Sequence, residues 1–224
     1  MMPSHSNTAS QPSSPRSFQA AFGDTKPWRG YHLHEHAGAD RASAENFIRE
    51  RFAACYGAQI GRLMPRLFSL TADDAQIIAG FGLREAAQEA LFLERYLPQP
   101  IEACISGHLA RPVRRDSIVE VGNFAGLGAG NTRMMIQALT QRLFSEGFQW
   151  VCFTGTTSLR NAFHRLALNP IELAHAEIHR LNQNERCLWG SYYDHDPRVL
   201  FGNVTEGYAA LLNTDTTSGS HTDE

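Results

Sequence analysis

The segment GLGAGN, residues 126–131, carries the clearest chemical signal in the sequence. Apolar residues before it predict a strand, and residues 132–147 after it predict a helix. The start of a helix presents backbone N–H groups without intrahelical partners, together with the positive end of the helix dipole. Gly126, Gly128 and Gly130 allow positive φ and a close approach of a ligand to the backbone. The segment is therefore typical of a site for a phosphate-bearing ligand, and the alternative is a flexible strand-to-helix connection.

Three polar residues follow these glycines. Asn131 or Thr132 is expected to cap the helix, and Arg133 in its first turn could reach a phosphate. The glycine spacing is neither that of the dinucleotide motif G-x-G-x-x-G nor that of the P-loop G-x-x-x-x-G-K-[ST]. Neither of those two nucleotide sites is therefore favoured.

Glu120 is the candidate acid or base. It lies between Val119 and Val121 in a strand that is otherwise apolar enough to be central in a sheet. Burial disfavours the charged carboxylate, so the pKa of Glu120 is expected to rise toward the range of a general base. The alternative is a structural ion pair of Glu120 with Arg84 or Arg133, because such pairs are common.

Histidines supply weaker candidates. His32, His34 and His36 project to one face of a predicted strand, and alternate histidines can bind zinc. No Cys, Asp or Glu cluster at ligand spacing supports a metal site, so an ordinary strand face is favoured. His164, one turn after Arg160 in a predicted helix, is either a solvated side chain or a proton donor.

The composition predicts one cytoplasmic domain with polar ends. Residues 1–28 and 213–224 are poor in apolar side chains and are predicted to be disordered, which leaves residues 29–212 for one core. The chain has 20 basic and 23 acidic residues without a basic run, so a nucleic-acid surface is not favoured. Neither a signal peptide nor a membrane-spanning apolar run is evident. Its 4 scattered cysteines predict reduced thiols, not a metal site or a disulfide scaffold.

Periodicity and turn residues predict the remaining elements. Strands are predicted at residues 31–36, 63–70, 76–84, 117–125, 148–154 and 188–193. Helices are predicted at 40–56 (capped by Asp40 and ended by Gly57), 85–97, 101–110, 157–168 (capped by Thr157) and 204–212. Hairpin strands followed by alternating strands and helices favour a mixed sheet with helices on both faces. The aromatic segments 91–93 and 189–193 are expected in the core, or along an acyl-chain channel.

Several motifs between residues 52 and 212 match one known family. They are Tyr56-Gly57-Ala58, Gly82-Leu83-Arg84, LFLERYL at 91–97, IVEVGNFA at 118–125, Phe153-Thr154-Gly155-Thr156, Leu159-Arg160-Asn161 and Trp189-Gly190-Ser191-Tyr192-Tyr193. In these motifs the chain resembles the thermostable hemolysin family of proteobacterial proteins. It also resembles acyl-homoserine lactone synthases and bacterial N-acyl amino acid synthases, whose strand motif E-x-S-R-F-A is matched by EVGNFA at 120–125.

The resemblance implies an α/β domain, with an α+β mixed sheet, of the GNAT-like acyl-CoA N-acyltransferase type. The loop 126–131 would then hold the pyrophosphate of CoA or the phosphate of an acyl carrier protein. Glu120 would be the base, with Arg84 and His164 as further catalytic candidates. Backbone N–H groups near Phe124 and Ala125 would stabilise the oxyanion.

This sequence departs from the pattern of that fold at three places. Gly128 and Gly130 fit the usual Gln/Arg-x-x-Gly-x-Gly/Ala loop, but Ala125 stands where Gln or Arg is usual. Asn123 replaces the arginine of the synthases. The tyrosine that such enzymes often carry on the following helix is replaced near Phe163 or His164.

The sequence and the resemblance are compatible with three functions. The first is an N-acyltransferase that moves an acyl group from acyl-CoA, or from acyl carrier protein phosphopantetheine, to a small-molecule amine such as an amino acid, without a metal. The second is a membrane-lytic hemolysin, although the sequence shows no amphipathic hairpin or helix suited to entering lipid. The third is an inactive GNAT-like domain that binds a ligand or partner.

Overall fold

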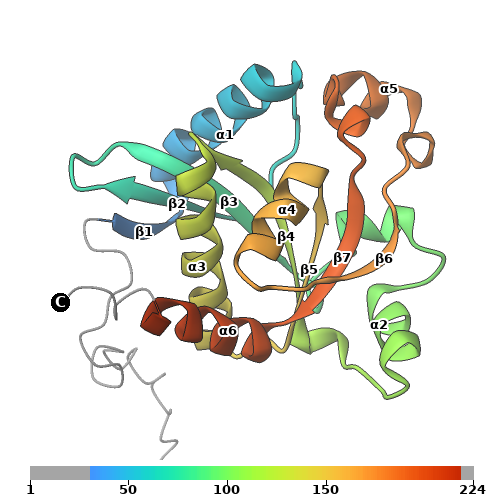
Figure 1. Cartoon of the computed structure of the whole chain (residues 1–224). Coiled ribbons are helices and arrows are strands. Elements are labelled where there is room, and N and C mark those ends of the chain that lie inside the picture. The colour runs from blue at the N-terminus through green and yellow to red at the C-terminus, as the bar shows by residue number, and fades with distance from the viewer. Residues whose placement is uncertain (1–30, 218–224) are drawn as a thin grey trace, which may run out of the picture.

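A computed structural model describes residues 31–217, and seven strands within this range form one mixed sheet (Figure 1). The sheet order is β1-β2-β3-β4-β5-β7-β6. Only β4 and β5 are parallel neighbours in this part of the chain. The strands are β1 (Tyr31–His36), β2 (Arg66–Ala72), β3 (Ile77–Glu85), β4 (Ile118–Gly126), β5 (Trp150–Gly155), β6 (Ile171–His175) and β7 (Arg198–Asn203).

Helices cover both faces of the sheet, as predicted. They are α1 (Arg41–Tyr56), α2 (Ile101–Leu109), α3 (Ala129–Ser145), α4 (Thr157–Arg165), α5 (Gln183–Arg186) and α6 (Val204–Thr217). On one face, α3 lies beside α6 and packs its apolar side chains against Val119 and Val121 of β4 (Figure 1). The opposite face receives α2 at Ile118 and α1 at Leu67. Neighbouring residues of β4 thus point into different cores, as the period of a strand requires.

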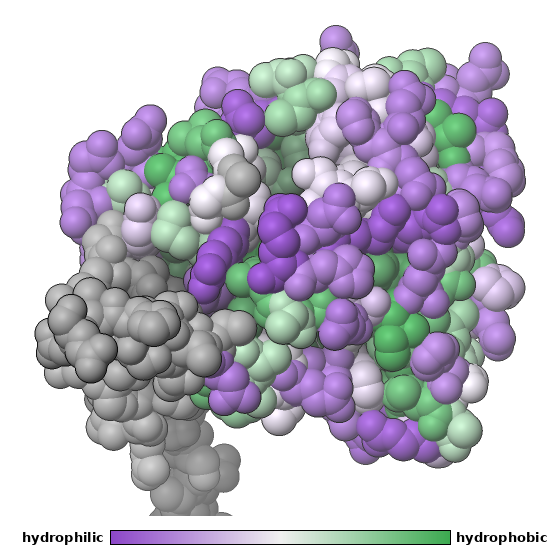
Figure 2. All heavy atoms as spheres, in the orientation of Figure 1, coloured by the Kyte–Doolittle hydropathy of each residue, from purple (hydrophilic) through white to green (hydrophobic). Residues whose placement is uncertain are grey.

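The surface over α3, α4 and α6 is mixed in hydropathy. Figure 2 shows hydrophilic side chains spread over this face, with hydrophobic ones scattered among them. The larger apolar side chains are instead buried between the sheet and its helices; Phe68, Phe81 and Phe201 have no exposed surface. Burial of apolar area in these layers is the main force that holds the helices on the sheet.

The local signals read from the sequence correctly place most of the first half of the fold. Strand β1, the β2–β3 hairpin and α1 are confirmed. Gly57 ends α1 in the left-handed conformation, with φ 63°. Asp40 occupies the predicted cap position, but its carboxylate contacts the His36 ring and does not cap the helix. Cys55, near the end of α1, is exposed.

The predicted helix over residues 85–97 is wrong. Strand β3 continues to Glu85, and only residues 92–96 are helical, as a short 3-10 helix. The backbone N–H groups of Phe92 and Leu93 donate to the carboxylate of Glu120 on β4. These two N–H groups therefore make long-range hydrogen bonds to a side chain, whereas in a regular α-helix they would donate to backbone carbonyls of the preceding turn.

The C-terminal third differs most from the predictions. Residues 188–193, predicted as a strand, instead belong to two 3-10 helices, Cys187–Trp189 and Tyr192–His195, and to the turn at Gly190 and Ser191 that joins them. Strands β6 and β7 were not predicted, and α6 continues to Thr217, beyond its predicted end at residue 212. The other residues predicted to be disordered, 1–28 and 218–224, lie outside the described residues.

Candidate active site

The sheet opens where β4 separates from β5. Their parallel pairing runs from Ile118 opposite Trp150 to Val121 opposite Phe153, although β4 continues to Gly126. Beyond Val121 a β-bulge in β4 begins.

In this bulge, Asn123 and Phe124 of β4 lie opposite the single residue Phe81 of β3. Asn123 has a φ of 54°, and its side-chain oxygen accepts the backbone N–H of Met64 at 2.7 Å. A bulge of this kind bends a strand and increases its twist, so it directs the end of β4 away from β5.

A cavity of about 1160 Å³ passes through this opening. Phe52, Tyr56, Trp189 and Tyr192 line it on the face that carries α1. On the opposite face its lining includes apolar residues of α3, α4 and α6: Leu139, Leu143, Ala162, Val204 and Ala210. A cavity this large, mostly apolar and with a few polar groups, is typical of a small-molecule or cofactor site.

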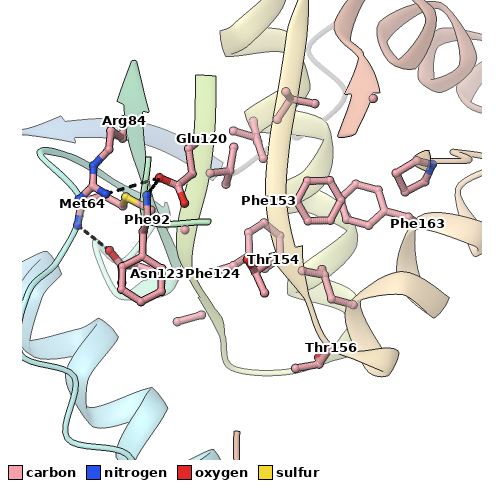
Figure 3. A pocket seen from close by; sticks show the side chains of 18 of the residues that line it. Met64, Arg84, Phe92, Glu120, Asn123, Phe124, Phe153, Thr154, Thr156 and Phe163 are labelled. Carbon is pink, nitrogen blue, oxygen red and sulfur yellow. Dashed lines mark hydrogen bonds and ion pairs between the residues drawn. The ribbon is translucent and has the colours of Figure 1, made fainter. Parts of the chain in front are cut away.

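Glu120 lies in the wall of this cavity on the α1 face and is only 2% exposed. Its two carboxylate oxygens accept the backbone N–H groups of Phe92 and Leu93, each at 2.9 Å (Figure 3). Burial raises the pKa of Glu120 to about 7, and the two N–H donors and the Arg84 charge only partly oppose that shift. The predicted burial is confirmed, and the carboxyl group can change its protonation state near neutral pH.

Arg84 lies directly opposite Glu120 on β3 and also lines the cavity. Arg84 Nη1 is 3.5 Å from Glu120 Oε2, and Arg84 Nε is 3.3 Å from Glu89 Oε1. The ion pair offered by the sequence as an alternative role for Glu120 is therefore present with Arg84. In Figure 3, Arg84, Phe92 and Glu120 lie together on one side of the opening, and Phe153 and Phe163 lie on the other.

The glycine loop is only partly inside this cavity. Of the predicted ligand-binding residues, the cavity lining includes Phe124, Ala125, Gly126 and Thr132, and it does not include Gly128, Gly130, Asn131 and Arg133. None of the three glycines uses the left-handed conformation that glycine allows; Gly128 is extended, with a φ of 172°. A Cβ atom added at Gly128 or Gly130 would meet nothing within 4 Å, so the backbone there remains approachable.

Helix α3 begins earlier than predicted. Gly128 is the N-cap, and Asn131 and Thr132 already lie within the first helical turn. The predicted caps are therefore wrong, but the helix N-terminus still lies at the end of β4. Arg51 of α1, which the sequence did not suggest, donates from Nε to the carbonyl of Gly126 at 3.2 Å and lines the cavity. This places a positive charge beside the loop.

The histidine candidates lie elsewhere. His164 is exposed on α4 and is not part of the cavity lining. His36 is buried, and its ring lies 2.7 Å from Ser69 Oγ and 2.8 Å from Asp40 Oδ2. Within residues 31–217, no group of three His, Cys, Asp or Glu side chains could hold a metal ion.

Two glycines inside strands mark a close contact that sequence reasoning missed. A Cβ atom at Gly122 would lie 2.2 Å from Met64 Cε, and one at Gly82 would lie 2.4 Å from Met64 Cβ. The Met64 side chain therefore lies directly on β3 and β4, at the edge of the cavity. Isolated glycines in a strand pattern are the signal that could have indicated this packing.

Trp189 and Tyr192 line the cavity because the segment around them is hydrogen-bonded to the end of α1. Ser191 N–H donates to the carbonyl of Tyr56 at 2.8 Å. Gly190 has a φ of 49°, and a Cβ atom there would lie 2.0 Å from the same carbonyl oxygen. Only glycine fits this contact. The aromatic segment is thus part of the cavity wall as well as of the core.

Comparison with known proteins identifies the fold. The sequence model of the thermostable hemolysin family matches residues 34–208. No protein with a curated function matches the sequence. No helix within residues 31–217 is both long and apolar enough to cross a membrane.

Solved structures with similar folds include three synthases. FeeM, an N-acyl amino acid synthase from uncultured soil microbes, aligns with a TM-score of 0.57 and 11% identity, over 83% of this chain and 97% of FeeM. The acyl-homoserine lactone synthase LasI aligns with a TM-score of 0.55 and 12% identity, over 82% of this chain and 94% of LasI. BjaI, a CoA-dependent acyl-homoserine lactone synthase solved with SAM and isopentyl-CoA, aligns with a TM-score of 0.53 and 15% identity, over 83% and 89% of the two chains. The predicted GNAT-like fold is confirmed.

Proposed function

Because the chain belongs to the thermostable hemolysin family and has a GNAT-like fold, we propose that it transfers an acyl group from a thioester carrier to an amine. One observation carries the proposal. A buried carboxyl group, Glu120, lies in the wall of a cavity that passes through the sheet, and its pKa is raised to about 7. A base with such a pKa can accept a proton near neutral pH and remain charged often enough to act.

The proposed reaction needs no covalent enzyme intermediate. The amine nitrogen attacks the thioester carbonyl carbon, the carbon–sulfur bond breaks, and the products are an amide and a free thiol. Glu120 accepts the proton that the amine loses, directly or through a water molecule, and the departing sulfur gains a proton. Backbone N–H groups of Phe124 and Ala125, where β4 has left β5, are the proposed donors to the developing oxyanion.

The two halves of the cavity suit different parts of the reactants. The half lined by α3, α4 and α6 contains the apolar side chains of Leu139, Leu143 and Ala162, which suit an acyl chain. The thioester carrier, CoA or the phosphopantetheine of an acyl carrier protein, would extend past Gly126 toward the start of α3. Its phosphate would meet the α3 N-terminus and Arg51. The half that contains Glu120 is left for the amine.

Thiol release and mass spectrometry of the products test this proposal. Purified protein is supplied with acyl-CoA or acyl carrier protein donors of several chain lengths and with a mixture of amines. The Glu120→Gln variant is expected to lower kcat/KM for N-acyl product formation by about 10²- to 10⁴-fold, the usual contribution of a general base. Glu146→Gln, which changes a carboxyl group outside the cavity lining, is the matched control.

Equal product levels from wild type and Glu120→Gln would remove Glu120 from the mechanism. Calorimetric titration with CoA and long-chain acyl-CoA separates an enzyme from an inactive binding domain.

We attribute lysis, the phenotype in the family name, to an acylated amphiphilic product. Leakage of liposomes caused by purified protein without acyl donor would contradict that attribution.

A further inference from the structure

Arg84 is a buried arginine whose donors are left unused. It is 7% exposed, and no residue of the described chain accepts a hydrogen bond from its guanidinium. Its contacts with Glu89 and Glu120, at 3.3 and 3.5 Å, are ion pairs without hydrogen-bond geometry. Within residues 31–217, Arg84 Nε and Trp150 Nε1 are the only buried side-chain nitrogen or oxygen atoms without a hydrogen-bond partner.

Arg115, which does not line the cavity, shows how completely this chain pairs a guanidinium elsewhere. It donates to both carboxylate oxygens of Glu94 and to the carboxylate of Glu102. It also donates to the backbone carbonyls of Ala86 and Glu89. A buried donor without an acceptor destabilises the fold, which is why such groups are rare outside functional sites. Arg84 faces the cavity, so an acceptor for its donors can come from a ligand there.

Building on the proposed acyl transfer, we propose that Arg84 binds the carboxylate of the acceptor while Glu120 faces its amine, so that the acceptor is an α-amino acid. The planar guanidinium matches a carboxylate and can bind both of its oxygens. Arg84 and Glu120 present opposite charges in contact with each other, on adjacent strands and on the same face of the sheet. The amine and the carboxylate of an α-amino acid are attached to one carbon atom, so these two groups are also close together and match the adjacent charges of Glu120 and Arg84.

The neighbouring charges allow a carboxylate to approach Arg84. Glu89, the other anion beside Arg84, is partly exposed and also lies 3.6 Å from the exposed Arg62. A ligand carboxylate at the Nη atoms of Arg84 therefore displaces no hydrogen bond of the protein. The carboxylate is not consumed in the reaction; it holds the acceptor so that the amine loses its proton to Glu120 and attacks the thioester.

The test compares acceptors that differ only in the carboxylate. Each of the twenty L-amino acids and its primary amide are supplied with the same acyl donor, and kcat/KM is measured for N-acylation. Wild type is expected to favour the best amino acid over its amide by about 100-fold or more, because a buried polar group that loses its partner discriminates strongly. Arg84→Met should reduce the preference to less than about 5-fold, mainly through KM. Arg62→Met, the other arginine at Glu89, is the matched control and should keep the preference.

Equal use of the acid and the amide by wild type would overturn this inference, even if Arg84→Met fails to fold, and would leave Glu120-dependent acyl transfer intact. The absence of acylation with any amine would instead contradict the proposed function. In that case calorimetric titration with the same amino acids tests whether Arg84 binds their carboxylate. Binding by wild type that Arg84→Met loses would support the carboxylate site, and the absence of binding would overturn it.

Discussion

Two ionic regions of this protein differ in how completely their arginines are paired. In the first region, Arg66 donates to Glu35, Glu85 and Glu146, and Arg142 donates to Glu35 and Glu146. Both guanidinium groups also lie over the ring of Phe68, at 5.3 and 5.2 Å from its centre. In the second region, Arg84 and Glu120 are more deeply buried, yet Arg84 makes no hydrogen bond among the described residues.

The electrostatic consequences in the two regions have opposite signs. Burial raises the pKa of Glu146, but hydrogen bonds from Arg66 and Arg142 outweigh it, so the pKa of Glu146 is lowered overall. Burial dominates at Glu120, whose pKa is raised to about 7. The first region therefore stabilises the charged carboxylates and holds β1, β2 and α3 together. In the second region, Glu120 binds a proton more tightly than usual, and the Arg84 donors beside the cavity have no acceptor in the described part of the chain. Under the proposed function, unused donors distinguish the ion pair at the site from the structural one.

The largest expected effect is the opposite pH dependence of stability in the two regions. Because the pKa of Glu120 rises from 4.5 to about 7 on folding, the folded protein binds this proton more tightly than the unfolded chain. The contribution is fully present below pH 4.5 and is lost as the pH rises through about 7, a change of roughly 3 kcal/mol. Urea unfolding across this range should show wild type losing stability relative to Glu120→Gln.

Glu146 supplies the contrast within the same experiment. Its lowered pKa means that its contribution is present above 4.5 and is lost as the pH falls below that value. Glu146→Gln should therefore flatten the acid side of the profile and leave the neutral side unchanged. A neutral-side change in Glu146→Gln as large as that in Glu120→Gln would contradict the distinction between the regions.

A smaller effect is expected from removing the paired arginine. Arg66→Met removes all its hydrogen bonds to three carboxylates, and these groups are partly exposed, so the free energy of unfolding should fall by about 2 kcal/mol. Because Arg66 does not line the cavity, kcat/KM should stay within about 3-fold of wild type. Thermal unfolding and the acyl-transfer assay measure the two quantities. A loss of activity without a loss of stability would assign Arg66 to the site.

The effect of salt on stability should be the smallest of these effects, and it should differ between the two regions. The Arg66 network is partly exposed, so about 1 M NaCl should roughly halve the stability cost of Arg66→Met. Glu120 is only 2% exposed, and buried pairs are screened much less, so the stability difference between wild type and Glu120→Gln should barely change. Urea unfolding at low and high salt checks both values. Equal salt sensitivity would mean that the two regions do not differ in solvent access.

Sequence patterns predicted the elements whose signals are local. The alternation at residues 31–36, the glycine after α1 and the apolar run before the glycine loop each depend on neighbouring residues, and each element is present. Strand β6 was missed because its burial comes from pairing with β7, not from its own pattern. The false helix at 85–97 has the composition of a helix, but its backbone donors bond to Glu120.

The sequence by itself determined that a lone carboxylate, Glu120, lies in an apolar strand followed by glycines and a helix N-terminus. Only the tertiary structure decided what surrounds it, because Arg84 and Phe92 reach Glu120 through pairing and hydrogen bonds between distant segments. The bulge at Asn123, which leads β4 away from β5, likewise depends on the register with β3. Composition can reveal which groups are costly to bury, but unused donors and open space are properties of the packed chain.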